Sequence, residues 1–338
     1  MTNLEPGLFA TVIRATRRIL PVATALAIAA PTPAAAPIEG DYPNKPIRLV
    51  VPYAPGGPVD IVGRIVALKL TGALGQQVIV DNRAGGGGNI AVEIVAKAVP
   101  DGYTLLIGAN GTNAINPSLY PGLRVDPARD LAPISMVASS PMILVTHPSV
   151  PANSVRDLVA LAKSRPGAIN FASSGSGSTA HLSGELFKSM TGIDIVHIPY
   201  KGAGPALTDL VGGQVQIMFT GVSATLPHVK SGKLKALAVS SEKRILILPD
   251  VPTIAEHIPG YEVITWYGVF APIKTPRALI DLLNQALVKI IAAPDARERF
   301  AALGADPITM PSAQFAAAIR KEVVKWAKVI KDSGVRPE

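Results

Sequence analysis

A serine, a histidine and an aspartate are the side chains of this 338-residue chain that come nearest to a catalytic set. Ser176 or Ser178 could serve as a nucleophile, with His181 as its general base and Asp209 to orient the imidazole. A serine nucleophile on an α/β fold normally lies in a Gly-x-Ser-x-Gly turn, and residues 175–179 depart from that pattern. The sequence therefore disfavours a serine hydrolase, which we keep as the alternative from another class of protein.

The spacing of the chain's other reactive residues disfavours metal and nucleotide sites. The five histidines, at positions 147, 181, 197, 228 and 257, form no i, i+4 pair and no His-Glu-x-x-His motif. The glycine run at 85–88 does not fit a Gly-x-Gly-x-x-Gly motif followed by an acidic residue at a strand end. We therefore expect no metal, no cofactor and no enzymatic activity.

The amino-acid composition excludes several further classes of protein and of functional site. The chain has no cysteine, which excludes disulfides, thiolate metal sites, cysteine nucleophiles and a lipoprotein anchor. Its formal net charge is +8, but the lysines and arginines are scattered, with few aromatic residues among them. This pattern favours a solvated basic surface over nucleic-acid binding. The length suggests about two domains.

The first residues have the layout of a secretory signal peptide. Arg14, Arg17 and Arg18 form a basic segment, the apolar run 19–30 follows, and residues 31–37 are rich in alanine and proline. The apolar run is too short to span a bilayer. We predict that residues 1–36 are a signal peptide, cleaved between about positions 29 and 36, and that the mature protein is exported to the periplasm.

Glycine-rich and hydroxyl-rich loops follow the predicted strands of an α/β fold. The short apolar run 47–51 predicts a strand, Pro55-Gly56-Gly57 breaks it, and helical spacing of apolar residues begins at Val59. Two glycines before a helix leave backbone N–H groups uncovered at the positive end of the helix dipole. Such a turn can hold a carboxylate or a phosphate without a charged side chain.

The same arrangement recurs along the chain. Predicted strands open into four further polar or glycine-rich loops, at residues 109–116, 173–181, 199–204 and 220–223. In open α/β sheets, ligands lie outside the carboxyl ends of the strands, where these loops are expected. The pattern predicts an exported two-domain protein that closes by a hinge around a small anion.

Extended and helical segments make up the rest of the chain. Residues 134–137 and 142–146 are predicted as two extended segments that leave the first domain, and residues 262–272 as an extended return. Trp266 and Tyr267 of that return are expected in the core rather than as a platform for a ligand. The C-terminal part is predicted to be helical at about 276–291, 295–303 and 312–331.

Six segments from about Tyr42 to the C-terminus carry a family resemblance. They begin at positions 52, 81, 100, 197, 209 and 249, and read PYxPGGxxD, DNRxGxGGNI, PDGYTL, HxPYKG, DLxGGQV and PxVPTxxE. In their order and spacing the chain resembles the Bug/TctC family, the extracytoplasmic solute receptors of tripartite tricarboxylate transporters.

The resemblance implies a fold and a division into lobes. The implied fold class is α/β: a two-lobed periplasmic-binding-protein fold of type II, a Venus flytrap, each lobe a mostly parallel sheet flanked by helices. Lobe 1 is expected to comprise residues 43–145 plus 264–338, and lobe 2 residues 146–263. The chain is expected to cross between them near 143–147 and 262–267.

The resemblance also implies which residues surround a small carboxylate, held largely by backbone N–H groups and water. From lobe 1 these are Tyr53, Gly56, Gly57, Asn110, Thr112 and Ala114. From lobe 2 they are Ser174, Gly177, Ser178, Thr179, His181, Tyr200, Lys201, Gly202, Asp209 and Thr220. This chain has Asn113 where the family often has histidine, and Ser178 where it more often has threonine. The identity of the ligand therefore stays open among dicarboxylates, tricarboxylates, aromatic acids, amino acids and nicotinate-like acids.

The function that follows from the resemblance is that of a periplasmic receptor. It would capture a carboxylate between two lobes and deliver it, as a monomer, to the permease subunits of a tripartite tricarboxylate transporter in the membrane. The alternative within binding proteins is a receptor that presents its ligand to a sensor kinase.

Overall fold

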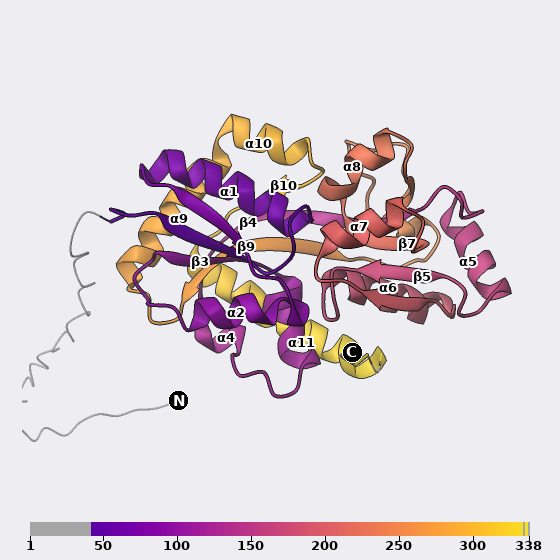
Figure 1. The fold of residues 1–338 in the computed structure, drawn as a ribbon, viewed down its shortest axis with the longest axis horizontal. Helices are drawn as coiled ribbons and strands as arrows, with labels where there is room; N and C mark the ends of the chain where they lie inside the picture. Colours follow the sequence, from indigo (N-terminus) through magenta and orange to yellow (C-terminus); the bar gives the residue numbers. More distant parts are fainter. Residues whose placement is uncertain (1–41, 334, 337–338) are drawn as a thin grey trace, which may run out of the picture. The chain divides into compact units, whose positions relative to one another are not determined.

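The structure is a computed structural model that describes residues 42–333 and 335–336 (Figure 1). The predicted signal peptide, residues 1–36, lies outside the described residues. Within the described part of the chain, no helix combines the length and the apolar character that crossing a membrane requires.

One mixed sheet of ten strands organises the described chain. Its first section contains β2 (Val78–Asn82), β1 (Ile47–Val51), β3 (Thr104–Ala109) and β9 (Ile264–Pro272), in this spatial order. Its second section contains β7 (Ile217–Gly221), β5 (Asn170–Ser173) and β6 (Val196–Pro199). The strand β4 (Leu131–Thr146) joins the two sections, and the strands β8 (Lys235–Val239) and β10 (Asp306–Pro307) pair with it.

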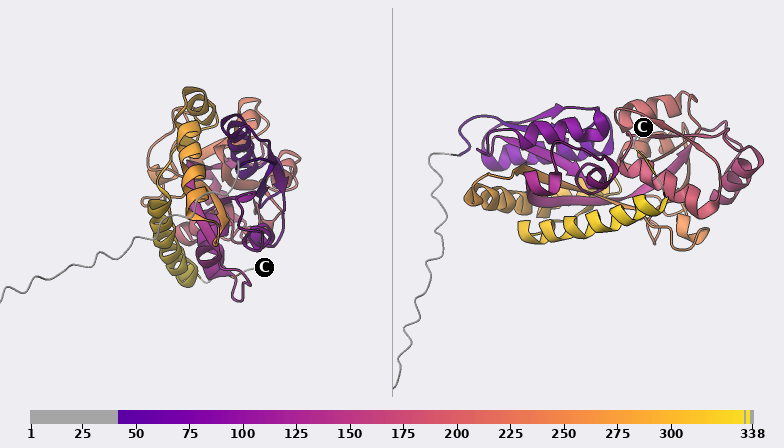
Figure 2. Two further views of the ribbon diagram at one scale, coloured as in Figure 1. Left: turned by 90° about the vertical axis from the view of Figure 1, so that its left-hand side faces the viewer. Right: turned by 90° about the horizontal axis from the view of Figure 1, so that it is seen from below.

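Helices connect the parallel strands and cover the sheet. Those of the first section are α1 (Pro58–Leu74), α2 (Asn89–Ala96), α3 (Asn116–Leu119), α4 (Pro127–Asp130), α9 (Arg277–Ala292), α10 (Pro294–Ala301) and α11 (Ser312–Ser333). Those of the second section are α5 (Val155–Ser164), α6 (Thr179–Thr191), α7 (Ala203–Val211) and α8 (Val222–Lys230). The short elements η1 (Gly86–Gly88), η2 (Gly111–Ile115) and η3 (Ile254–Glu256) are single helical turns. The long α11 packs against β4 and η2 and also contacts α6 of the second section (Figure 2).

The strand β4 is continuous where the sequence predicts two extended segments. Residues 131–141 pair with β9, residues 142–146 pair with β7, and residues 143–146 also pair with β8. Pro133 lies at a register shift, and Pro141 is the last residue that pairs with β9 before the partner changes. A proline cannot donate a hydrogen bond to a ladder, so it is tolerated at such irregularities.

The strand directions turn the two sections toward each other. β1 pairs in parallel with β2 and β3, and β5 pairs in parallel with β6 and β7. β3 and β4 are both antiparallel to β9, so β3 runs in the direction of β4, whereas β7 runs against β4. The carboxyl ends of the first section's parallel strands therefore point to the second section, and those of the second point back. Figure 1 shows β9 alongside β4, and residues 142–146 of β4 continue into the second section.

The interior strands are buried on both faces by the helix layers. Val50 of β1, Leu106 of β3 and Phe219 of β7 are each 0% exposed. Near-continuous apolar strands of this kind are typical of a parallel sheet covered on both sides. On one face, α6 lies close to β5 because Gly184 has no side chain; a Cβ there would lie 2.3 Å from a ring carbon of Phe171.

We predict that Gly184→Ala lowers the free energy of unfolding by about 1–3 kcal/mol, because the added methyl must displace the buried ring of Phe171. Gly72→Ala in α1 is the matched control, since an added Cβ there meets no atom within 4 Å. It should raise the free energy of unfolding by about 0.5–1 kcal/mol through helix propensity. Urea unfolding followed by circular dichroism measures both. Equal effects of the two substitutions would contradict the close packing of α6 on β5.

Candidate functional site

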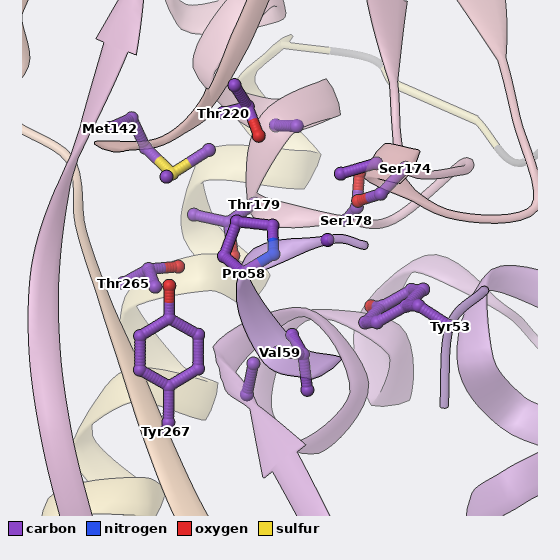
Figure 3. A pocket seen from close by; sticks show the side chains of 15 residues that line it. Tyr53, Pro58, Val59, Met142, Ser174, Ser178, Thr179, Thr220, Thr265 and Tyr267 are labelled. Atoms are coloured by element: carbon purple, nitrogen blue, oxygen red, sulfur yellow. The ribbon is translucent and has the colours of Figure 1, made fainter. Parts of the chain in front are cut away.

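A small cavity lies where the facing strand ends of the two sections meet (Figure 3). Its volume is about 40 Å³, which is room for about three water molecules. Its walls come from both sections and from the joining strand β4, and consist of Tyr53, Gly57, Pro58, Val59, Ala109, Met142, Ser174, Ser178, Thr179, Ala180, Ala203, Thr220, Gly221, Thr265 and Tyr267.

Four helices begin at this cavity. The N-cap of α1 is Gly57, that of α6 is Ser178, and that of α8 is Gly221, and all three residues line the cavity. Ala203, the first residue of α7, lines it as well. The first-turn N–H groups of a helix have no acceptor within the helix, and they carry the positive end of its dipole. The cavity is therefore positive through its backbone.

The lining residues include no aspartate, glutamate, lysine, arginine or histidine. The polar side chains among them are hydroxyls, which belong to Tyr53, Ser174, Ser178, Thr179, Thr220, Thr265 and Tyr267. Burial raises the pKa of the Tyr53 and Tyr267 phenols, so both stay protonated and can donate a hydrogen bond. Figure 3 shows the Tyr267 hydroxyl directed toward Thr265, with Tyr53 and Ser174 on the other side of Pro58. The hydroxyls of Thr179 and Thr265 donate their protons to Asn110 Oδ1, so the other five are the uncharged donors that suit an anion or a polar group of a ligand.

Asn110 connects the two sections at the wall of the cavity. It directly follows β3, and its Oδ1 accepts hydrogen bonds from the Thr179 hydroxyl of α6 and the Thr265 hydroxyl of β9, each 2.9 Å long. Its Nδ2 donates to the Ile264 carbonyl at 3.0 Å. Asn110 is fully buried, and both threonines line the cavity. The side chain of Asn110 thus positions two of the cavity's hydroxyls and does not itself line the cavity.

Asp60 shapes the Pro55-Gly56-Gly57 turn. Its carboxylate accepts hydrogen bonds from the Gly56 N–H at 3.0 Å, from Asn82 Nδ2 at 2.9 Å and from Arg64 Nε at 2.9 Å. Burial acts to raise the pKa of Asp60, but the hydrogen bonds from Arg64, Gly56 and Asn82 outweigh it and lower the pKa. Asp60 therefore stays charged. Its carboxylate accepts the hydrogen bond of the Gly56 N–H, which we predicted from the sequence would bind a ligand.

The predicted site residues fall into three groups. Six line the cavity: Tyr53, Gly57, Ser174, Ser178, Thr179 and Thr220. Tyr200 and Lys201 line a second, larger cavity, and Gly56 lines a third hollow beside α7. The remaining seven, Asn110, Thr112, Ala114, Gly177, His181, Gly202 and Asp209, line none of these three cavities.

Most residues of the third group have partners inside the protein. The Thr112 hydroxyl forms hydrogen bonds with the backbone of Ala109 and with Asn113 Oδ1. The Gly177 N–H donates to His181 Nδ1 at 3.2 Å, and Asp209 accepts from the Tyr200 hydroxyl at 2.7 Å. Burial and the contact with Asp209 raise the pKa of Tyr200 to about 12. A Ser-His-Asp catalytic set would require a hydrogen bond between Asp209 and His181. Asp209 instead accepts its hydrogen bond from Tyr200.

The second cavity lies beside the first. Its volume is about 240 Å³, and its walls are Tyr53, Gly85, Gly86, Gly87, Gly88, Tyr120, Ser174, Gly175, Ser176, Pro199, Tyr200 and Lys201. Tyr53 and Ser174 line both cavities. We call the first the inner cavity and the second the outer cavity.

Sequence reasoning missed the cavity residues that belong to the strands β4 and β9. Met142 lies on β4, and Thr265 and Tyr267 lie on β9. Tyr267 is 2% exposed, as expected of a core residue, and yet it lines the inner cavity. Neither strand carries a loop signal at these positions, because the three residues lie within strands and not in the loops that follow them. The helix-start residues Pro58, Val59, Ala180 and Ala203 also line it and could have been found from the adjoining glycine and serine loops.

His181 and His197 form a buried aromatic stack. Their rings lie 3.9 Å apart between centroids at 10°, and Phe171 lies against His197 at 4.9 Å. Burial, the neighbouring His197 and Lys188 lower the pKa of His181 to about 3. Burial and Lys188 lower the pKa of His197 to about 4. Both rings are therefore neutral at pH 7. Among the described residues, no group of three or more histidine, cysteine or acidic side chains could hold a metal ion.

Two α/β sections whose strand ends face a common cavity define a solute-binding protein of the periplasmic-binding-protein type. Residues 62–335 match the family model of the tripartite tricarboxylate transporter family receptor, TctC. The chain belongs to this family, known also as Bug.

Individual relatives agree with this assignment. Protein BugT of Bordetella pertussis is 41% identical over 305 residues, which cover 89% of this chain and 94% of BugT. The structure "R. palustris Rpa4515 with adipate" superposes with a TM-score of 0.86 at 38% identity, covering 88% of this chain and all of that one. The periplasmic binding protein BugD superposes with a TM-score of 0.85 at 37% identity, covering 88% of this chain and 100% of BugD.

Family membership settles three predictions from the sequence. The resemblance to the Bug/TctC family is confirmed, and so is the α/β periplasmic-binding-protein fold, in which antiparallel strands accompany the parallel ones. The family consists of receptors, so the prediction of a binding protein and not an enzyme is confirmed as well.

The histidine stack makes stability depend on pH. Because the folded state lowers the pKa of His181 and of His197 below the unfolded value of about 6.5, the unfolded chain binds more protons as the pH falls. We predict that the histidine contribution to the free energy of unfolding is constant above about pH 6.5. Below that pH it falls, down to about pH 4 for His197 and about pH 3 for His181, by up to about 1.4 kcal/mol per pH unit for each histidine. Urea unfolding at several pH values measures it, and His197→Gln should reduce the slope. An unchanged slope in that variant would contradict the assignment.

Proposed function

We propose that the protein is a periplasmic solute-binding protein that captures a small carboxylate between two lobes. Lobe 1 comprises residues 43–145 plus 264–338, and lobe 2 comprises residues 146–263. The loaded receptor delivers its ligand, as a monomer, to the permease subunits of a tripartite tricarboxylate transporter. The family's description as a transporter receptor supports the delivery step.

The observation that carries the proposal is the start of four helices at one uncharged cavity. Amides around Gly57, Ser178, Ala203 and Gly221 supply hydrogen-bond donors and positive dipole ends without a lysine or arginine. A carboxylate bound there exchanges its hydration for fixed N–H and O–H groups. The adipate of the relative Rpa4515 supports the choice of a carboxylate.

Contacts between the lobes support capture by closure. The Ala54 N–H donates to the Lys201 carbonyl at 3.1 Å, and the Tyr120 hydroxyl donates to the Ser176 carbonyl at 2.6 Å. At Gly204 the two backbones are so close that a Cβ would lie 2.0 Å from the Pro55 carbonyl oxygen. We place the crossings between the lobes near residues 143–147 and 262–267. β4 changes its pairing partner just before the first of them, after Pro141, and β9 begins within the second, at Ile264.

The periplasmic location is part of the proposal. The predicted signal peptide at residues 1–36, with cleavage near 29–36, supports export. The description of the relative BugD as a periplasmic binding protein agrees with it.

We predict that a carboxylate raises the melting temperature of the protein made from residues 37–338, after unfolding and refolding to remove any ligand carried over. A ligand at 100 times its dissociation constant adds about 2.7 kcal/mol to stability, and each kcal/mol raises the midpoint by about 2–4 °C. The panel contains adipate, succinate, citrate, benzoate and glutamate.

Adipamide is the matched control for adipate, because it keeps the length of the ligand and removes its charge. It should give no shift. A panel in which no acid raises the melting temperature, or in which the diamide acts as well as the acid, would count against carboxylate capture.

We predict that Gly204→Ala weakens carboxylate binding by about tenfold to a hundredfold, because the methyl collides with Pro55 as the lobes close. The unliganded protein should keep its urea midpoint, because lobes that part in the absence of ligand move Gly204 away from Pro55. Gly212→Ala at the other end of α7 is the control, where a Cβ meets its nearest atom at an ordinary 3.4 Å. Isothermal titration calorimetry measures both, and equal affinities would exclude closure at this contact.

A further inference from the structure

The C-terminal helix α11 presents a cationic face to the outside of the protein, along which it runs in Figure 2. Its inner side is buried through Phe315, Ile319, Trp326 and Ile330. The exposed side chains among its described residues include no acid, and they include every lysine and arginine of the helix: Arg320, Lys321, Lys325, Lys328 and Lys331. Against these five cations the helix has two acidic residues, so it supplies +3 of the chain's formal net charge of +8.

The helix gathers cations that are separate in the sequence. Steps of four, three and three residues lead from Lys321 to Lys325, Lys328 and Lys331. Residues three or four positions apart are neighbours on a helix surface, and like charges at these spacings repel each other. The cationic face of α11 is therefore formed at a cost to the stability of the helix, which an opposite charge outside the protein would remove.

Three of the five cations have no ion-pair partner in the described part of the chain: Arg320, Lys321 and Lys331. Lys325 lies 3.9 Å from a carboxylate oxygen of Glu322, and its ammonium lies 5.4 Å from the centre of the Trp326 ring. Glu322 also accepts a hydrogen bond from Trp326 Nε1 at 2.9 Å. Like charge that is concentrated without partners in its own protein is typical of a surface that meets an opposite charge elsewhere.

The shape of this face fits an extended anionic surface. From Arg320 to Lys331 the helix rises about 17 Å, and the cations project from one continuous helix. Neither the inner cavity, the outer cavity nor the hollow beside α7 has a wall on α11. Val324 lies among the cations and is 72% exposed. A bilayer with anionic headgroups offers a plane of phosphates to the cations and an apolar boundary to the valine.

We propose that the cationic face of α11 docks the protein on the surface of an anionic phospholipid bilayer. Clusters of about four to eight lysines and arginines on a helix are typical of binding to anionic lipid. The helix packs mainly against β4, η2 and α3, and docking through it covers no wall of the cleft cavities. The inference goes beyond carboxylate capture and does not depend on it.

The test measures cosedimentation of the protein made from residues 37–338 with lipid vesicles at low salt. Vesicles of equal parts phosphatidylglycerol and phosphatidylcholine should bind the wild type, and vesicles of phosphatidylcholine alone should not. Raising NaCl to about 0.5 M shortens the Debye length to about 4 Å and should abolish binding. The triple variant Arg320→Gln, Lys321→Gln and Lys331→Gln should bind about tenfold or more weakly, because each cation near the surface adds to the attraction.

The matched control is a second triple variant, Lys163→Gln, Lys230→Gln and Lys233→Gln, which removes the same charge from exposed positions of the second section. It should bind as the wild type does, and so should Lys321→Arg with Lys331→Arg, which keeps the charge of α11. Urea unfolding should show that the α11 triple variant is at least as stable as the wild type, because glutamine is a good helix former and like-charge repulsion is relieved.

The inference is overturned if the wild type binds neither kind of vesicle, which would leave an acidic protein surface as the partner of α11. Equal binding to both kinds of vesicle, or an equal loss of binding in the two triple variants, overturns it as well. None of these outcomes affects the test of carboxylate capture, which is measured without lipid.

Discussion

The structure depends on a simple constraint: a site without charged side chains is positive only if several helices begin there. A single helix start supplies a few amides and about half a charge. Four helices, α1, α6, α7 and α8, begin at the inner cavity, two or more elements apart along the chain. Bringing them together requires parallel strands whose carboxyl ends face each other. The opposed directions of β3 and β7 along β4 provide this arrangement.

Close approach of the two sections explains why the cleft is rich in glycine. Added Cβ atoms at Gly87, Gly204 and Gly221 would lie 2.0–2.7 Å from atoms of facing segments, Ser176, Pro55 and Pro58 respectively. Backbone can meet backbone only where no side chain intervenes. Ordering these flexible loops costs conformational entropy, which hydrogen bonds such as the one from Tyr120 to Ser176 help to offset.

Much of the scaffold could be predicted from local pattern. The strand at 47–51 and the helices near 276–291 and 312–331 follow from apolar periodicity, and they lie where expected. Patterns of this kind failed at β4, where two predicted segments form one strand, because a register shift leaves no local mark in the sequence. The loops after β1 and β5 could be predicted as ligand loops because glycine, serine and threonine next to an apolar run can be recognised from the sequence alone.

The sequence alone determined the alternation of strands and helices, the glycine and hydroxyl loops that end them, and the family. Tertiary structure decided which of those loop residues face the cavity and which serve the protein. Asn110 and His181 have donors and acceptors that suit a ligand, yet their partners are Thr179, Thr265 and Gly177. Tyr267 has the pattern of a core residue and lines the cavity. Spacing shows what a side chain can bind, but only the packed neighbours determine whether its hydrogen bonds are already used.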